Sequence, residues 1–293
     1  MQNNETKAVI TISALVNANV EHVWKCWTLP FHILKWNFAI SEWQTTFAEN
    51  DLREGGSFVS RMEAKDGSMG FDFGGVYDVV DIHQKISYTM EDGRRVETTF
   101  EDSSEGTRIV TNFEAESMNS LELQEQGWNS ILQNFKKYAE SGKSDPLVFE
   151  KEMAAPPSVV YDVMIGEDSY RQWTKVFNET SHFIGNWQKG SEILFVGVDA
   201  NGEQGGMVSF IKENMPAKFI SIEHRGMLKG EDKILEGPEV EPWKGGLENY
   251  HFIPTTEGCM LRIEMDANED FKSYFEETWP KALDVLKRLA EEK

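Results

Sequence analysis

The chain has few cysteines and lacks the common sequence patterns of catalytic or metal sites. Only Cys26 and Cys259 occur among 293 residues, and they fall in different halves. A structural disulfide is therefore not expected, and a reducing compartment, which we take to be the cytoplasm, fits this content. The patterns H-E-x-x-H, C-x-x-C and G-x-S-x-G are missing, and no two histidines have metal-ligand spacing. We therefore expect neither a metal nor a cofactor.

A long hydrophobic run and a recognisable leader are also missing. No stretch of about 18 apolar residues occurs, so we expect no membrane span. The opening residues, MQNNETKAVI, do not combine a basic region with an apolar run. The sequence therefore predicts no signal peptide.

Positive charge is scarce. The 29 Lys and Arg residues face 50 Asp and Glu residues, which gives a formal net charge of -21 that both halves share. An acidic surface repels phosphate groups, so nucleic acid and anionic membrane surfaces are not expected partners.

Large apolar side chains, by contrast, are plentiful and recur in two similar patterns. Each pattern has steps of three and four residues, which predicts one buried face of a helix. The second follows the first after 151 residues. The first comprises Trp128, Ile131, Leu132, Phe135 and Tyr138, and the second comprises Trp279, Ala282, Leu283, Leu286 and Leu289.

The rest of each half repeats the same plan. Both halves read as a strand, two short helices, a run of antiparallel strands and one long terminal helix. Asp66-Gly67 and Asn201-Gly202 predict equivalent hairpin turns. A stretch rich in Gly, Ser and Pro at 140–146 separates two predicted domains, 1–142 and 147–293.

The second half contains an additional segment, 226–246, that mixes Gly, Pro and charged residues with Trp243. We interpret it as a surface loop. The alternatives are a lid over a second cavity or a contact between the domains.

The stretches REGGSF, EDGRRVETTFEDSSEGTRIVTNFEAE and NSLELQEQGWNSILQNFKKYAE resemble the SRPBCC, or START-like, superfamily. Within it, they are similar to the branch related to the C-terminal domain of the activator of the ninety-kilodalton heat-shock protein. The resemblance covers nearly all of residues 8–140. Its most specific part is the pattern Asn119, Ser120, Glu122, Gln124, Gly127, Trp128, Ile131, Leu132 and Phe135. The second half shares the layout alone.

The resemblance implies an α+β architecture of two helix-grip domains, in each of which a curved antiparallel sheet wraps around the long C-terminal helix. It also implies a cavity between sheet and helix that, in the superfamily, holds apolar or aromatic ligands. The expected partner is accordingly a small apolar ligand.

Aromatic and aliphatic side chains of both halves are the candidates for the cavity walls. An ordinary core role is the alternative for each of them. Trp128 is the strongest candidate because Trp279 recurs at its position. The first half contributes Trp36, Phe58, Phe73, Tyr88, Trp128 and Leu132, and the second contributes Trp173, Phe195, Phe210, Tyr250, Trp279 and Leu283.

Both terminal helices contain a weak point next to this tryptophan. Gly127 lowers helix propensity by about 1 kcal/mol relative to alanine, and Pro280 removes a backbone donor. In the second half Thr278 stands where the first has Gly127. The weak point is either a bend that follows the sheet or a hinge that opens the cavity.

Evidence for catalysis in the sequence is thin. His32 and His83 are candidates for a general acid or base if they face the cavity, and a surface or structural role is the alternative. We assign Arg94, Arg95 and Glu97 to a solvated strand face.

We favour ligand binding without catalysis as the function. The alternatives are a cyclase or dehydratase acting on a polyketide-like substrate, and a co-chaperone-like interaction protein. The heat-shock activator also has a separate domain with a Trp-His-Trp motif, which nothing in this sequence matches. The sequence leaves the ligand and the oligomeric state open.

Overall fold

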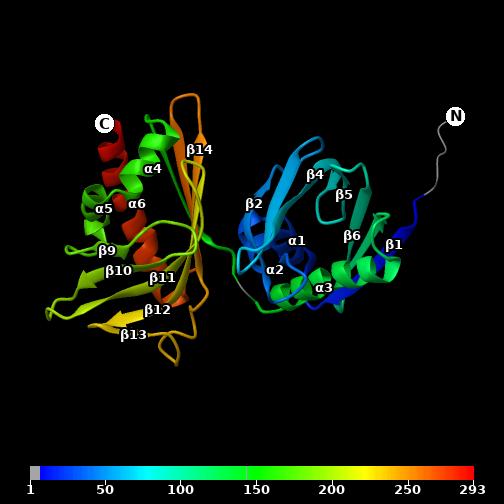
Figure 1. Ribbon diagram of the computed structural model, residues 1–293, viewed down its shortest axis with the longest axis horizontal. Coiled ribbons are helices and arrows are strands. Elements are labelled where there is room, and N and C mark those ends of the chain that lie inside the picture. The colour runs from blue at the N-terminus through cyan, green and yellow to red at the C-terminus, as the bar shows by residue number, and fades with distance from the viewer. Residues whose placement is uncertain (1–6, 143) are drawn as a thin grey trace. The chain divides into compact units, whose positions relative to one another are not determined.

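The structure is a computed structural model that describes residues 7–142 and 144–293. The chain divides into two compact units, Met1–Ser144 and Asp145–Lys293 (Figure 1). Each unit is described by itself below.

The first unit contains a seven-stranded antiparallel sheet in the order β1-β7-β6-β5-β4-β3-β2. Two short helices follow β1, and a long helix, α3, ends the unit and lies alongside β1 (Figure 1). The elements are β1 (Val9–Val16), α1 (Val20–Thr28), α2 (Pro30–Trp36), β2 (Trp43–Asn50), β3 (Ser57–Ala64), β4 (Gly70–Asp81), β5 (Lys85–Met90), β6 (Arg95–Ser103), β7 (Gly106–Glu114) and α3 (Leu121–Ala139).

Local sequence sets the ends of these helices. The Asn19 side chain accepts a hydrogen bond from the His22 backbone N–H at 2.9 Å and caps α1. Pro30 occupies the first turn of α2, where its missing N–H removes no helical hydrogen bond. Ser120 caps α3 by accepting from the Leu123 N–H at 3.2 Å. The long helix therefore starts at a fixed residue and presents a defined face to the sheet.

The core of the first unit lies between the sheet and α3. Strand β1 alternates strictly between exposed and buried residues, as expected for a strand with one covered face. Phe135 of α3 is fully buried, and its ring centroid lies 4.7 Å from that of Trp27 and 4.9 Å from that of Trp36. The helix thus joins the sheet to the two short helices.

The second unit repeats the plan with an eight-stranded sheet in the order β8-β15-β14-β12-β11-β10-β9, to which β13 is added through β12. Helices α4 and α5 lie beside the long helix α6 (Figure 1). The elements are β8 (Leu147–Met153), α4 (Pro157–Ile165), α5 (Glu167–Trp173), η1 (Thr174–Val176), β9 (His182–Gly185), β10 (Glu192–Val198), β11 (Gln204–Met215), β12 (Phe219–Lys229), β13 (Asp232–Ile234), β14 (Leu247–Pro254), β15 (Cys259–Met265) and α6 (Glu269–Glu291).

These two units confirm the predicted α+β class and the helix-grip fold, with a curled antiparallel sheet and a terminal helix in each. The predicted turns at Asp66-Gly67 and Asn201-Gly202 connect β3 to β4 and β10 to β11. Helix α6 continues through Pro280 without interruption. None of the helices in the described residues is both long and apolar enough to cross a membrane.

One glycine in each unit holds the first strand close to the strand that pairs with it. Gly106 has a φ of 119°, and a Cβ there would lie 2.2 Å from the Val16 carbonyl oxygen. Gly258 has a φ of 155°, and its Cβ would lie 2.2 Å from the Met153 oxygen. Gly106 begins β7 and Gly258 directly precedes β15, so the repeat preserves a contact that no larger residue fits.

The additional segment of the second unit folds back on the sheet. β13 pairs with the end of β12, beyond the residues that pair with β14. Turns then lead to Gly246, whose carbonyl oxygen accepts a hydrogen bond from the His224 N–H at 2.9 Å. Val240 is fully buried, whereas most of the segment is exposed. This agrees with a surface position, and a role as a lid stays a prediction.

A larger residue can replace Gly127 without a steric clash, so the effect of a substitution on stability can be predicted. It lies within α3, and a Cβ added there would meet nothing within 4 Å. Gly127→Ala is therefore expected to stabilise the first unit by about 1 kcal/mol through helix propensity alone. Chemical denaturation measures the change. A loss of stability would show that this part of the helix depends on the freedom of glycine.

Candidate functional site

A cavity of about 290 Å³ lies in the first unit between the sheet and α3. Its walls come from β1, α1, α2, the strands β3 to β7 and α3. All six candidates of the first half line it, namely Trp36, Phe58, Phe73, Tyr88, Trp128 and Leu132. The structure therefore brings together side chains that are up to 96 positions apart in the sequence, from Trp36 to Leu132.

Aromatic rings form the cavity wall through edge and face contacts. The Phe58 ring meets that of Tyr88 edge-on at 4.7 Å, and the Phe73 ring meets that of Trp128 at 6.0 Å. Trp128 also stacks on Phe113 with the ring centroids 4.2 Å apart. Such contacts add stability beyond burial and fix the ring orientations. The wall is therefore largely preformed.

Some polar groups of the wall satisfy one another. The hydroxyls of Thr98 and Thr111 lie 3.0 Å apart, and the Tyr77 hydroxyl donates to the Asn50 Oδ1 at 2.7 Å. These contacts meet the requirement that a buried polar group has a partner. The hydroxyls of Thr98, Thr111 and Tyr77 therefore do not need a ligand as a hydrogen-bond partner.

Two further polar side chains of the cavity, Tyr88 and Arg94, have hydrogen-bond donors without a partner among the described residues. Tyr88 packs its ring among Phe58, Phe73 and Tyr77, but no described residue forms a hydrogen bond with its hydroxyl. Arg94 also lines the cavity, and its side chain retains 18% exposure. The assignment of Arg94 to a solvated strand face is wrong, because it lies in the turn before β6, where strand alternation does not apply.

Burial controls the protonation of the two cavity tyrosines. Loss of hydration raises the pKa of Tyr77 and of Tyr88 well above the usual value, against small lowering effects of Asn50 on Tyr77 and of Arg94 on Tyr88. Both hydroxyls therefore stay protonated at neutral pH and act as neutral hydrogen-bond donors.

These raised pKa values predict alkaline sensitivity. The neutral phenols contribute stability that is fully present below about pH 10, the unfolded pKa, and is lost as pH rises above it. We expect Tyr77 and Tyr88 to ionise in step with unfolding of the first unit, followed by phenolate absorbance and circular dichroism. Tyr88→Phe should remove one late-titrating group. Ionisation of Tyr88 well before unfolding would contradict the expectation.

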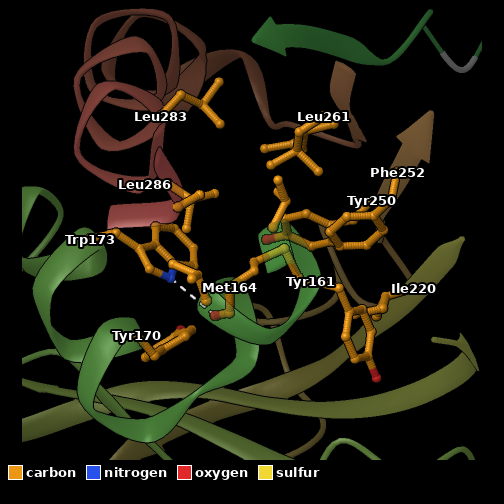
Figure 2. Packing of buried hydrophobic residues seen from close by; sticks show 14 of the residues in the cluster. Tyr161, Met164, Tyr170, Trp173, Ile220, Tyr250, Phe252, Leu261, Leu283 and Leu286 are labelled. Carbon is orange, nitrogen blue, oxygen red and sulfur yellow. Dashed lines mark hydrogen bonds between the residues drawn. The ribbon is translucent and has the colours of Figure 1, made fainter. Parts of the chain in front are cut away.

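The second-half candidates mostly share one packed cluster. Trp173, Tyr250, Trp279 and Leu283 are buried there, and Phe195 packs against it with partial exposure. The Trp279 ring lies 6.0 Å from that of Trp173 and 6.2 Å from that of Tyr250. Figure 2 shows Trp173 between α5 and the α6 residues Leu283 and Leu286, with its indole Nε1–H bonded to the Met164 oxygen at 3.0 Å. A ligand role for these residues stays a prediction.

Phe210 lies apart from this cluster. The Arg225 guanidinium lies 3.7 Å above its ring, and the fully buried neighbours Ser209 and Ile211 occupy the adjacent positions of β11. Neighbouring residues of a strand point to opposite faces, so Phe210 faces away from the core. The prediction that Phe210 lines a second cavity is wrong, because its side chain lies on the face of β11 that points away from the core.

The second unit contains a series of hydrogen-bonded polar side chains that the sequence did not predict. The Ser209 Oγ lies 2.9 Å from the His224 Nδ1, and the His224 Nε2 lies 3.4 Å from the Glu248 Oε2. The Tyr250 hydroxyl donates to the same carboxylate. The chain crosses β11, β12 and β14, so its members are neighbours only after strand pairing. It satisfies polar groups at the edge of the core.

The histidines proposed as acid or base lie outside the cavity wall. His32 is fully buried, with its Nδ1 2.7 Å from the Tyr138 hydroxyl oxygen. His83 lies in the turn after β4, and its ring meets that of Trp24 edge-on at 5.7 Å. Both histidines thus have structural contacts instead. Within the described residues, no group of three or more His, Cys, Asp or Glu is placed to hold a metal ion.

Comparison with known proteins gives matches of two kinds. The sequence model of the family "Activator of Hsp90 ATPase homolog 1-like protein" matches residues 17–140. The AHSA1-like protein from Aeromonas hydrophila is 41% identical over 46% of this chain and 93% of its own, with a TM-score of 0.45. A protein from Cytophaga hutchinsonii is 47% identical over 46% of this chain and 92% of its own, with a TM-score of 0.40.

The second kind covers both units. The di-domain ARO/CYC StfQ from the steffimycin biosynthetic pathway matches 97% of this chain and 98% of its own at 14% identity, with a TM-score of 0.56. This likeness supports a tandem arrangement of the same fold. None of the curated proteins matches the chain.

Proposed function

Because the chain belongs to the Activator of Hsp90 ATPase homolog 1-like family of the SRPBCC superfamily, we propose that its first unit binds a small aromatic ligand in the cavity that Trp128 lines. The superfamily fold is shared by many functions, so the proposal depends on the site and not on the fold. The site is concave, largely apolar and built from rings that hold one another in place.

The observation that carries the proposal is the space left among the six predicted side chains. A cavity of about 290 Å³ lies just below the range of roughly 300–1,000 Å³ that small-molecule sites occupy, which fits a small ligand. Protein cores are otherwise close-packed, and unfilled apolar space costs stability. A ligand with one or two aromatic rings would recover these contacts.

A fluorescence titration of the full chain tests this proposal. The neutral fluorophore phenylnaphthylamine is expected to bind saturably, and Trp128→Ala should weaken binding about tenfold by removing an aromatic wall. The matched control is Trp243→Ala, which removes a tryptophan of the second unit's surface segment and should leave the affinity unchanged. No saturable binding, or equal affinity in the Trp128 variant, would contradict the proposal.

Mass spectrometry under native conditions would identify a physiological ligand. Protein purified from its own host should carry an apolar molecule that is released on denaturation. The Trp128→Ala variant, purified in the same way, should carry less of it.

Gly127 distinguishes a rigid cavity from one that opens through α3. If the glycine is a hinge, Gly127→Ala will slow both association and dissociation of the fluorophore while it stabilises the helix. If it is only a tolerated weak point, the exchange rates will not change. Stopped-flow fluorescence separates these two results.

A cyclase-type activity on a polyketide-like substrate is the second candidate. It is favoured by the Tyr88 hydroxyl and Arg94, which offer donors to a carbonyl or enolate oxygen within the apolar cavity. The similar two-domain plan of StfQ agrees with it at the level of the fold. Incubation with a linear poly-β-ketone mimic tests it, and cyclisation that is no faster than with the Arg94→Gln variant would exclude it.

A further inference from the structure

We propose that the ligand carries an anionic oxygen group, such as a carboxylate, and that Arg94 and Tyr88 bind this group. The inference rests on the proposed ligand binding and specifies the ligand class. It follows from the position of Arg94, the charged side chain among the residues that form the wall, beside the neutral donor Tyr88 in a largely apolar cavity.

The backbone fixes Arg94 at the cavity. Gly93 adopts a φ of 79°, and the Arg94 carbonyl oxygen accepts a hydrogen bond from the Met90 N–H at 2.8 Å. This tight turn leads from β5 into β6. The guanidinium group is thereby held against the cavity at low exposure instead of extending into solvent.

Only some of the N–H donors of the Arg94 guanidinium group have hydrogen-bond partners among the described residues. Its Nε donates to the Asp92 Oδ2 at 2.8 Å, and its Nη1 donates to the Glu114 carbonyl oxygen at 3.4 Å. An arginine side chain has five N–H donors. Three donors therefore have no partner among the described residues. Asp92 offsets part of the positive charge, but it does not occupy these directions.

Tyr88 supplies a second donor at the same cavity. Its ring is enclosed by other aromatic rings, and its hydroxyl has no hydrogen-bond partner among the described residues. Arg94 lines the same cavity as this hydroxyl, so one ligand group can reach both donors. Tyr88 is partly exposed, and its hydroxyl remains available to donate to a ligand acceptor in the cavity.

An anionic oxygen fits these two donors better than a neutral acceptor. A carboxylate accepts charge-assisted hydrogen bonds from a guanidinium group in a planar, paired geometry. It has further lone pairs for the tyrosine hydroxyl. A cationic head group would face Arg94 unfavourably. The rings of the wall would meanwhile cover the aromatic part of the ligand.

Calorimetric titration of the full chain with a matched ligand pair tests the inference. Naphthoate and neutral naphthamide have nearly the same shape and differ mainly in charge. We expect naphthoate to bind at least about tenfold more tightly, as a charge-assisted contact implies. Arg94→Gln should abolish this preference, and the circular dichroism spectrum of the variant, compared with that of the unmodified chain, shows whether it is folded.

Two additional variants sharpen the test. Tyr88→Phe should reduce the preference severalfold without abolishing it, because the guanidinium group remains. Arg95→Gln is the matched control, since Arg95 is the exposed next residue and is not part of the cavity wall. It should leave both affinities unchanged.

The outcomes separate the two proposals. If both compounds bind equally well, or if Arg94→Gln retains the preference, the anionic-group inference is wrong and ligand binding still stands. If neither naphthoate nor naphthamide binds and phenylnaphthylamine also fails to bind, both proposals are wrong.

Discussion

Phe135→Ala is expected to destabilise the first unit by about 3–5 kcal/mol, the usual cost of removing a buried phenylalanine. The Phe135 side chain is fully buried and contacts the rings of both Trp27 and Trp36. Its removal leaves a void where α3 joins the short helices. Differential scanning calorimetry should show that the transition of the first unit moves to lower temperature while a second transition stays in place.

The equivalent position in the second unit provides the control. Leu286 lies 151 residues after Phe135 and is 1% exposed. Leu286→Ala should move only the other transition, by a loss of about 2–5 kcal/mol. The pair of variants also tests our proposal that 1–142 and 147–293 fold as independent domains. A single transition that both variants shift alike would contradict that proposal.

Gly106→Ala is expected to destabilise the first unit by roughly 3 kcal/mol or more, because backbone strain and a steric clash act together. The φ of 119° disfavours a side chain, and the new Cβ would lie 2.2 Å from the Val16 oxygen. Relief of this clash requires β1 to move away from β7, with which it pairs over its whole length. Urea denaturation measures the loss.

Gly67→Ala is the matched control for Gly106→Ala. Gly67 also has a positive φ, 74°, but a Cβ there would meet nothing within 4 Å. Only the backbone strain of about 1–2 kcal/mol then remains. Equal losses for the two substitutions would show that the contact with Val16 contributes nothing.

Much of the fold could be predicted from the sequence, because the local patterns predicted the same elements in both halves of the repeat. The spacing of apolar residues predicted the helices that became α3 and α6, and the Asp-Gly and Asn-Gly pairs predicted two hairpins. These signals depend only on neighbouring residues. The repeat then indicated that each long helix covers its own sheet.

The details of the site depended on features that no local pattern shows. The face of Phe210 cannot be counted from either end of β11, because irregularities at Val208/Ser209 and at Ile211/Glu213 disturb simple alternation on both sides of it. Arg94 was missed because a turn, and not strand parity, directs it. The distance between Ser209 and His224 depends on the same irregular strand pairing.

Whether a core is filled also lies beyond pattern reading. Trp128 and Trp279 occupy equivalent positions and both contact neighbouring rings, Trp128 that of Phe113 at 4.2 Å and Trp279 that of Phe177 at 4.9 Å. The space left beside Trp128 depends on the summed shapes of side chains contributed by many elements. Periodicity identifies the residues that face inward but not the volume that they leave.

The acidity of the chain has a kinetic consequence for an anionic ligand. The net charge of -21 repels a carboxylate over distances at which mobile ions act, whereas Arg94 attracts it only at contact. Salt at about 0.15 M screens charges that are more than about 8 Å apart in water and affects a partly buried contact much less. Added salt should therefore accelerate capture and leave the residence time nearly unchanged, which is the reverse of electrostatic steering.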